Sequence, residues 1–70
     1  MKIRVNGAWR EVLDSGAAAA TLEALLHRFG FGNATVATAV NGEFVPHGAR
    51  GRCLVQEGDR IEVLAPMQGG

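Results

Sequence analysis

Two Asn-Gly pairs constrain the fold of this chain more than any other feature. Asn6-Gly7 follows an alternating run from Lys2 to Val5, and Asn41-Gly42 follows a second run from Val36 to Val40. Asparagine and glycine both tolerate positive φ, which a two-residue hairpin turn requires at its central positions. The sequence therefore predicts two β-hairpins, each with a short return strand after its turn. The second return strand ends at Pro46.

The register of the first hairpin decides where its tryptophan lies. In a two-residue turn Ile3 faces Arg10, which puts Trp9 beside Arg4 on the opposite face of the sheet. Arg10 would then extend its charged end to the sheet margin. A one-residue bulge would instead turn Trp9 into the core, and the sequence leaves both arrangements open.

An amphipathic helix is predicted between the hairpins. Four large apolar residues recur with the period of one helical face, namely Leu22, Leu25, Leu26 and Phe29. Thr21 is the best N-cap, although the high helix propensity of alanine leaves a start as early as Ala17 open. Gly30 is the expected C-terminal stop, with Phe31 folding back as in a Schellman ending.

A last strand and a short tail complete the chain. Alternating residues after the Gly58-Asp59 turn predict a strand up to Ala65, and Pro66 stops it because proline cannot donate to a ladder. The four residues that follow are Met67, Gln68, Gly69 and Gly70. Two side-chain-free residues can thread a narrow cleft, so the Gly70 carboxylate is the candidate reactive group. Chain ends also fray commonly, and the dipeptide alone does not decide between the two readings.

The order hairpin, helix, hairpin and last strand defines an α+β fold. A last strand that returns beside the first requires a right-handed crossover and a parallel central pair, which is the β-grasp arrangement. We expect one β-grasp domain over residues 1–66 and a flexible diglycine tail over 67–70, leaving from the same end as the Asn6-Gly7 turn. The helical face should pack on inward strand positions, namely Ile3, Val5, Val36, Val40, Ile61 and Val63.

Charge and cysteine usage restrict the classes of function. Seven basic and seven acidic residues cancel, so nucleic-acid binding lacks its main energetic term and a membrane-surface role weakens likewise. The run from Ala17 to Ala20 is too short for a signal-peptide core or a spanning helix, which together with the single cysteine indicates a cytoplasmic protein. Cys53 stands in an apolar triplet and is expected to be a core residue. Cys53, His27 and His47 lack the spacing of a metal site, and no catalytic group is predicted.

The chain resembles the thiamine-biosynthesis sulfur carriers, the ThiS family of ubiquitin-like proteins. The similarity extends over essentially the whole chain and is carried by segments in a fixed order, namely Val5-Asn6-Gly7, residues 21–26, 40–46 and 57–63, and the terminal Gly-Gly. Each segment alone is only weakly specific for the family, but together in this order the segments are fairly specific. Trp9 and Cys53 are not diagnostic positions.

The resemblance implies a chemistry for the tail. An E1-like adenylyltransferase of the ThiF type would adenylate the Gly70 carboxylate with ATP, while Gly69, Gln68 and Met67 are recognised in its cleft. Sulfur from a donor such as a cysteine desulfurase would replace the adenylate, and the thiocarboxylate would serve a thiazole synthase of the ThiG type. The chain would be a substrate that binds no cofactor and is a monomer when free.

The docking surface is predicted from alternation in the last strand. If Ile61 and Val63 point inward, Leu64 points outward, and in the two-residue register Trp9 and Arg4 share that outer face. An exposed apolar cluster that includes tryptophan is typical of a partner site. Leu64, Arg4 and Trp9 are therefore the predicted docking residues for the activating enzyme. A bulge that buries Trp9 would leave the face merely solvated.

Three other functions stay open at this point. The same tail chemistry serves molybdopterin synthase, whose small subunits resemble this chain but tend to be longer. A ubiquitin-like protein modifier is a further alternative. A passive β-grasp interaction module would use the sheet face without any tail chemistry.

Overall fold

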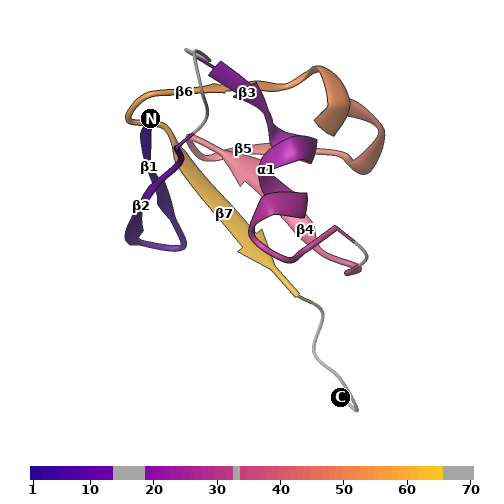
Figure 1. The fold of residues 1–70 in the computed structure, drawn as a ribbon. Helices are drawn as coiled ribbons and strands as arrows, with labels where there is room; N and C mark the ends of the chain where they lie inside the picture. Colours follow the sequence, from indigo (N-terminus) through magenta and orange to yellow (C-terminus); the bar gives the residue numbers. More distant parts are fainter. Residues whose placement is uncertain (14–18, 33, 66–70) are drawn as a thin grey trace.

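The computed structural model describes residues 1–13, 19–32 and 34–65 of the 70-residue chain. A five-stranded mixed sheet forms its centre, in the order β2-β1-β7-β4-β5 (Figure 1). The strands are β1 (Lys2–Val5), β2 (Ala8–Glu11), β4 (Ala37–Val40), β5 (Glu43–Val45) and β7 (Arg60–Leu64). The central pair, β1 and β7, is parallel, and the other pairs are antiparallel. This arrangement, with one helix across the sheet, confirms the predicted β-grasp fold.

Both Asn-Gly pairs form the predicted hairpin turns. Asn6 and Gly7 have φ of 50° and 85°, and Asn41 and Gly42 have φ of 52° and 85°. In the first hairpin Arg4 pairs with Trp9, so the two-residue register is confirmed and the bulge that would bury Trp9 is absent. The tryptophan side chain is 57% exposed on the face away from the helix.

Arg10 lies as the two-residue register requires. It pairs with the buried Ile3 and so starts from the core side of the sheet, yet its own side chain is exposed. The guanidinium carbon stands 5.5 Å from the centre of the Phe29 ring at the end of the helix. The charge therefore reaches the sheet margin and covers an aromatic ring instead of entering the core.

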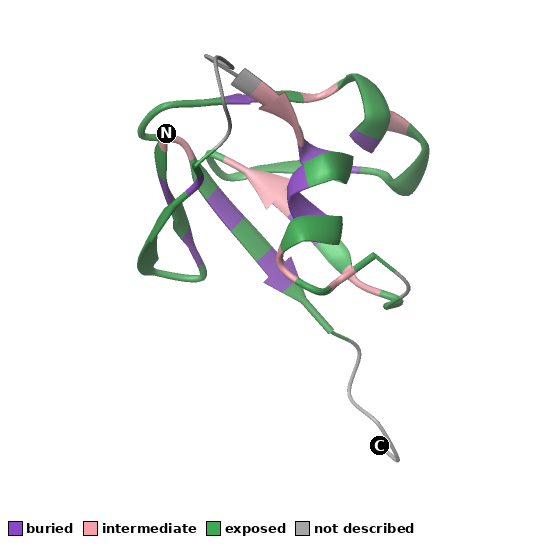
Figure 2. Cartoon of the chain, viewed as in Figure 1, coloured by how far each residue is buried: buried purple, intermediate pink, exposed green. Residues whose placement is uncertain are grey.

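The helix α1 (Leu22–Arg28) has the predicted ends. The Thr21 hydroxyl accepts a hydrogen bond of 3.1 Å from the Ala24 N–H, as an N-cap does. At the other end Gly30 has φ of 89°, and the Phe31 N–H donates to the Leu26 carbonyl at 2.7 Å, which confirms the Schellman ending. The buried residues of α1 and of the strands belong to one cluster, in which the helix packs on the sheet (Figure 2).

The possible extension of the helix toward Ala17 is wrong for the residues that the structure describes. Ala19–Thr21 form a strand, β3, which pairs with β6 (Leu54–Gln56) in a second, two-stranded sheet. Helix propensity is a weak preference, and backbone pairing with a neighbouring strand overrides it here. The residues before Ala19 lie outside the described part of the chain.

The core lies between α1 and the inner face of the five-stranded sheet. Its buried apolar residues are Ile3, Val5, Val12, Leu22, Leu25, Leu26, Val45, Val55, Ile61 and Val63. Of the predicted set, Phe29, Val36 and Val40 are partly buried and pack against this cluster. Val12, Val45 and Val55 were not in the prediction, because each stands near the end of a short run whose inward phase the sequence leaves undefined. Cys53 is partly buried against the same cluster, as expected.

A buried arginine was also missed. The polar, glycine-rich stretch after Pro46 forms a 3₁₀ helix, η1 (His47–Arg52), in which Arg50 is only 7% exposed. The Arg50 guanidinium donates from Nε to the Thr38 hydroxyl at 3.1 Å and from Nη2 to the Val36 carbonyl at 2.6 Å. These bonds fasten η1 to the start of β4.

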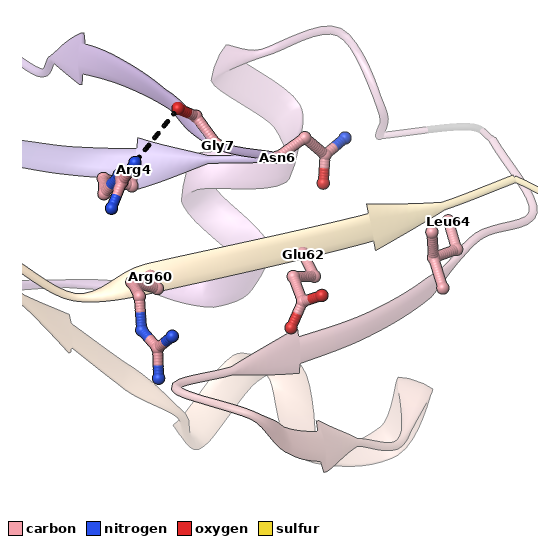
Figure 3. A pocket seen from close by; sticks show the side chains of 6 residues that line it. All are labelled: Arg4, Asn6, Gly7, Arg60, Glu62 and Leu64. Atoms are coloured by element: carbon pink, nitrogen blue, oxygen red, sulfur yellow. Dashed lines mark hydrogen bonds between the residues drawn. The ribbon is translucent and has the colours of Figure 1, made fainter.

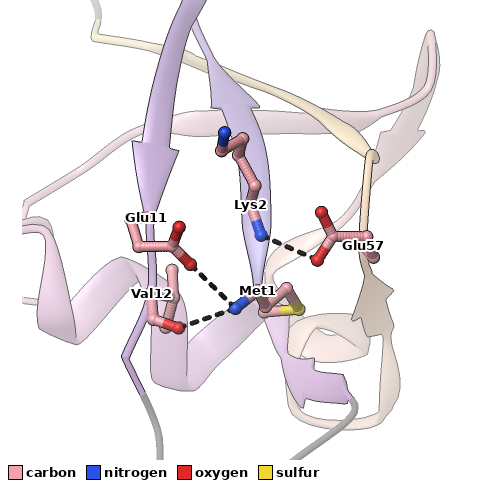
Figure 4. Close-up of polar contacts among 5 residues, drawn as sticks. All are labelled: Met1, Lys2, Glu11, Val12 and Glu57. Carbon is pink, nitrogen blue, oxygen red and sulfur yellow. Dashed lines mark hydrogen bonds and ion pairs between the residues drawn. The ribbon is translucent and has the colours of Figure 1, made fainter.

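The opposite end of the hairpin from the Asn6-Gly7 turn is closed by polar contacts (Figure 4). The Met1 amino group lies 3.0 Å from the Glu11 carboxylate and donates to the Val12 carbonyl at 3.0 Å. The Lys2 N–H donates to the Glu57 carboxylate at 2.9 Å. These bonds tie the start of β1 both to its hairpin partner and to the turn before β7.

Candidate functional site

The outer face of the sheet, away from α1, carries a shallow groove along β7. The groove has a volume of about 460 Å³ and is lined by Arg4, Asn6, Gly7, Arg60, Glu62 and Leu64 (Figure 3). The alternation of β7 explains its lining, because Ile61 and Val63 are buried while Arg60, Glu62 and Leu64 are exposed. The first hairpin supplies the other wall.

The hairpin side of the groove is basic and aromatic. The Arg4 guanidinium carbon lies 5.3 Å from the centre of the Trp9 ring, and Nη2 of Arg4 reaches the Gly7 carbonyl at 3.5 Å. Arg4 pairs in register with Arg60 on β7, which brings two cations to adjacent strands of the same face. Such a pair favours an anionic group of a partner between them.

The opposite side of the outer face is mostly apolar, with Glu62 as its charged residue. Leu64 is 65% exposed and pairs with Ala37, while Phe44 on β5 is 69% exposed and pairs with Ala39. A small hollow of about 100 Å³ between β5 and β7 is lined in part by Phe44, Leu64 and the two alanines. We call five of the exposed side chains of this face the outer-face patch: Trp9, Arg4, Arg60, Leu64 and Phe44.

The structure brings the three predicted docking residues onto one face. Leu64, Arg4 and Trp9 are all exposed there, with Leu64 and Arg4 in the same groove. Arg60 and Phe44 were missed by the sequence interpretation. The phase of β5 carries the missed signal for Phe44, because an inward Val45 requires its neighbour to face outward.

The end of β7 lies beside the Asn6-Gly7 turn, as predicted. The Asn6 side chain makes hydrogen bonds to both backbone polar groups of Val63, at 2.8 Å and 3.1 Å. These bonds hold the end of β7, and the next residue, Leu64, lines the groove. The predicted tail residues Met67, Gln68, Gly69 and Gly70 lie outside the described residues.

The described residues contain neither a metal-binding cluster nor a membrane-spanning helix. Within residues 1–13, 19–32 and 34–65, no three side chains of His, Cys, Asp or Glu gather as a metal site would require. No helix among these residues has the length and apolar character needed to span a membrane.

Fold and groove together define the class: a ubiquitin-like β-grasp domain whose last strand ends beside an exposed sheet face. A family model described as the ThiS family matches residues 3–70. The chain belongs to the ThiS family.

Solved structures agree with this assignment. The crystal structure of the thiamine biosynthesis protein ThiS from Geobacter metallireducens is 32% identical, with a TM-score of 0.83 over the whole of both chains. The solution structure of a thiamine biosynthesis protein from the same organism is 31% identical, with a TM-score of 0.75 over all of this chain and 88% of the other.

A curated relative is much longer than this chain. A protein named thiazole synthase from Paramagnetospirillum magneticum is 36% identical over 70 residues, which are the whole of this chain and 20% of that protein. The chain thus spans about one fifth of the length of the curated relative it matches. Most of that protein has no counterpart in the sequence described here.

Proposed function

We propose that this chain is a sulfur carrier for thiazole formation in thiamine biosynthesis. The observation that carries the proposal is the family match, which runs through the Gly-Gly segment to residue 70. A relative named thiazole synthase contains a region similar to the whole chain, which supports a thiazole synthase of the ThiG type as the acceptor of the sulfur.

The proposed reaction begins at the Gly70 carboxylate. A carboxylate is a poor electrophile, so an E1-like adenylyltransferase of the ThiF type first transfers AMP from ATP to it and releases pyrophosphate. Bare glycines at positions 69 and 70 let the chain enter a narrow active site, with Gln68 and Met67 at its mouth. ATP is used by this partner, and the carrier holds no cofactor of its own.

Sulfur transfer follows from the activated state. The outer sulfur of a persulfide on a donor such as a cysteine desulfurase attacks the acyl-adenylate and displaces AMP, which gives an acyl disulfide at Gly70. A second thiol then attacks the donor-side sulfur of that disulfide, becomes oxidised to a disulfide with it, and releases a thiocarboxylate at Gly70. The thiocarboxylate is an ionised, soft nucleophile that carries one sulfur atom without release of free sulfide. The chain is thus a substrate and not a catalyst. A reducing cytoplasm suits this chemistry and the unpaired thiol of Cys53.

The outer-face patch is the proposed docking surface for the activating enzyme. It contains an exposed tryptophan and two arginines, residue types that dominate the binding energy of interfaces. Leu64 and Phe44 add exposed apolar surface beside them. Its place at the end of β7 lets the enzyme bind the domain and receive the tail at the same time.

Intact-mass measurement tests the reaction. The protein is purified from its own host and incubated with its E1-like enzyme, ATP and sulfur donor. Its intact mass is then measured by mass spectrometry. We expect a species heavier by the difference between a sulfur and an oxygen atom. The same measurement establishes whether the mature chain ends at Gly70.

A deletion of Gly70 is the matched control. We expect it to abolish the acyl-adenylate while the melting temperature stays unchanged, because a glycine has no side chain to bury in the core. An undiminished ATP-dependent acyl-adenylate in the deletion variant would overturn the assignment of Gly70.

A further inference from the structure

Both ends of β7 are held by an asparagine that also makes a hairpin turn. At the start of the strand, Oδ1 of Asn41 accepts from the Arg60 N–H at 2.9 Å, and its Nδ2 donates to the Asp59 carboxylate at 3.1 Å. At the other end, Oδ1 of Asn6 accepts from the Val63 N–H at 2.8 Å, and its Nδ2 donates to the Val63 carbonyl at 3.1 Å. The turn chemistry alone requires neither set of bonds.

The Asn6 side chain pairs with Val63 where the backbone of β1 no longer does, because β1 ends at Val5. The backbone ladder between β1 and β7 ends where the Asn6 N–H donates to the Ile61 carbonyl at 2.9 Å. Past this point the chain of β1 turns away, and the N–H and C=O of Val63 face the gap that it leaves. The carboxamide of Asn6 offers the same acceptor and donor as a peptide group, so it extends the ladder by one step. Figure 3 shows this side chain between β1 and the end of β7.

The extension fixes the direction in which the chain leaves the sheet. On its other edge β7 pairs with β4 as far as Leu64 and Ala37. With Asn6 in place, the last residues of β7 are therefore held on both edges. Without it, the strand would be held on one edge only and would be free to bend toward the open groove.

We propose that Asn6 is a positioning residue for activation of the tail. The inference rests on the proposed function, in which the enzyme docks on the outer-face patch and receives the tail from the end of β7. Asn6 contacts no reacting atom. It acts through Val63 by setting the path from the docked domain to the Gly70 carboxylate, and misplacement of a reacting group by even about 1 Å lowers rates up to about 100-fold.

Two matched substitutions test the proposal. Asn6→Gly and Asn41→Gly each remove one carboxamide, and glycine accepts the φ of 50° and 52° found at these positions without strain. Each turn becomes Gly-Gly, so the loss of backbone restraint in the unfolded chain is the same. The variants differ in which end of β7 is released. Asn41→Gly thus controls for general loss of stability.

Two readouts are expected to separate the variants. Amide hydrogen exchange should accelerate at Val63 in Asn6→Gly and at Arg60 in Asn41→Gly. In ATP–pyrophosphate exchange with the ThiF-type enzyme, Asn6→Gly should lower kcat by about tenfold while KM stays within about twofold, because the docking patch is intact. Asn41→Gly should keep both constants close to those of the wild type.

The outcomes distinguish this inference from the function beneath it. Equal kcat values for the two variants, with an active wild-type chain, overturn the positioning role of Asn6 and leave the sulfur-carrier function intact. A rise in KM alone overturns it as well, because Asn6 would then belong to the docking surface. A wild-type chain that supports no pyrophosphate exchange overturns the proposed function, and the inference falls with it.

Discussion

The two faces of the central sheet are built from the same strands and differ in almost every property. Along β7, Ile61 and Val63 are 2% and 5% exposed on the inner face, whereas Leu64 is 65% exposed on the outer face. The inner face is covered by α1 and held by apolar packing. The outer face carries arginines, a tryptophan and two large apolar side chains with no element of the described chain over them.

This difference separates stability from recognition on a single strand. A substitution at an inward position of β7 changes the core, while the next residue along changes only the surface offered to a partner. A domain of 70 residues has a thin core and little stability to lose.

Leu25→Ala is expected to have the largest effect. Leu25 is 1% exposed at the centre of the helical face, and its truncation should cost about 2 to 5 kcal/mol of unfolding free energy. That loss approaches the whole stability of a small domain, about 5 kcal/mol at the low end of the usual range. Urea unfolding followed by circular dichroism measures it.

The exposed Glu23 on the same helix supplies the control. Glu23→Ala should change the unfolding free energy by no more than about 0.5 kcal/mol, as surface substitutions usually do. Equal stability of the Leu25 and Glu23 variants would mean that the helical face does not organise the core.

Arg50 is the one charged side chain that is buried among the described residues, and it bonds to the buried Thr38 of β4. It therefore tests how much a polar contact on the inner side of the sheet contributes to stability. Arg50→Met keeps the aliphatic stem and removes the donors to Thr38 and Val36, so we expect a loss of about 1.5 to 3 kcal/mol in unfolding free energy. Arg50→Lys should recover only part of it, because an ammonium group cannot reproduce the planar fork of donors. Urea titration compares the three proteins.

Arg52→Met is the matched control for the buried arginine. Arg52 is exposed in the same 3₁₀ helix and makes one long bond, 3.3 Å, to the Gly48 carbonyl. Its replacement should leave the midpoint of unfolding nearly unchanged. A loss as large as that of Arg50→Met would show that helix η1, and not the buried guanidinium, carries the effect.

Much of the fold was predictable from the sequence because local signals agreed with one another. The Asn-Gly turns set the hairpin registers, the period of Leu22 to Phe29 set the helix, and Gly30 set its end. Strand β3 was missed because its alanines favour a helix, and the pairing with β6 that overrides this preference is a long-range contact.

The candidate site was predictable where it followed from alternation. Leu64, Arg4 and Trp9 were placed on the outer face by strand period and turn length alone. The same alternation puts Arg60 and Phe44 on the outer face, so both were within reach of the sequence. What required the strand order is that Arg60 lies next to Arg4, because β1 and β7 come from opposite ends of the chain. The hydrogen bonds of Asn6 and Asn41 to β7 were not predicted, because the positive φ of a hairpin turn already accounts for an asparagine at each position.

Leu64→Asp tests whether the outer face is a docking surface. We expect association with the E1-like enzyme to weaken by about tenfold, or about 1.4 kcal/mol, because the charge is placed in the apolar half of the patch. The domain should stay folded, since the side chain is largely exposed. Isothermal titration calorimetry measures the affinity, and circular dichroism checks the fold.

Leu54→Asp is the control for that variant. Leu54 is 62% exposed on β6, a strand of the second sheet outside the outer-face patch. Its affinity for the enzyme should match that of the wild type. If Leu64→Asp binds as tightly as the control, recognition must lie in the tail and turns alone.

The smallest expected effect concerns how firmly the outer face is organised before any partner binds. Arg4 lies over the Trp9 ring at 5.3 Å, and Arg10 lies over Phe29 at 5.5 Å on the margin of the inner face. A double-mutant cycle with Arg4→Gln and Trp9→Leu compares the unfolding free energies of the wild type, the two single variants and the double variant. We expect a coupling of about 0.5 kcal/mol in the unfolding free energy, the lower end for exposed cation–π pairs. The cycle with Arg10→Gln and Phe29→Leu should give at least as much, because the Phe29 ring is partly buried and less solvated. A coupling of zero between Arg4 and Trp9 would mean that this half of the patch is ordered only on binding. A value above that of the Arg10 pair would break the contrast between a packed inner face and a loosely held outer one.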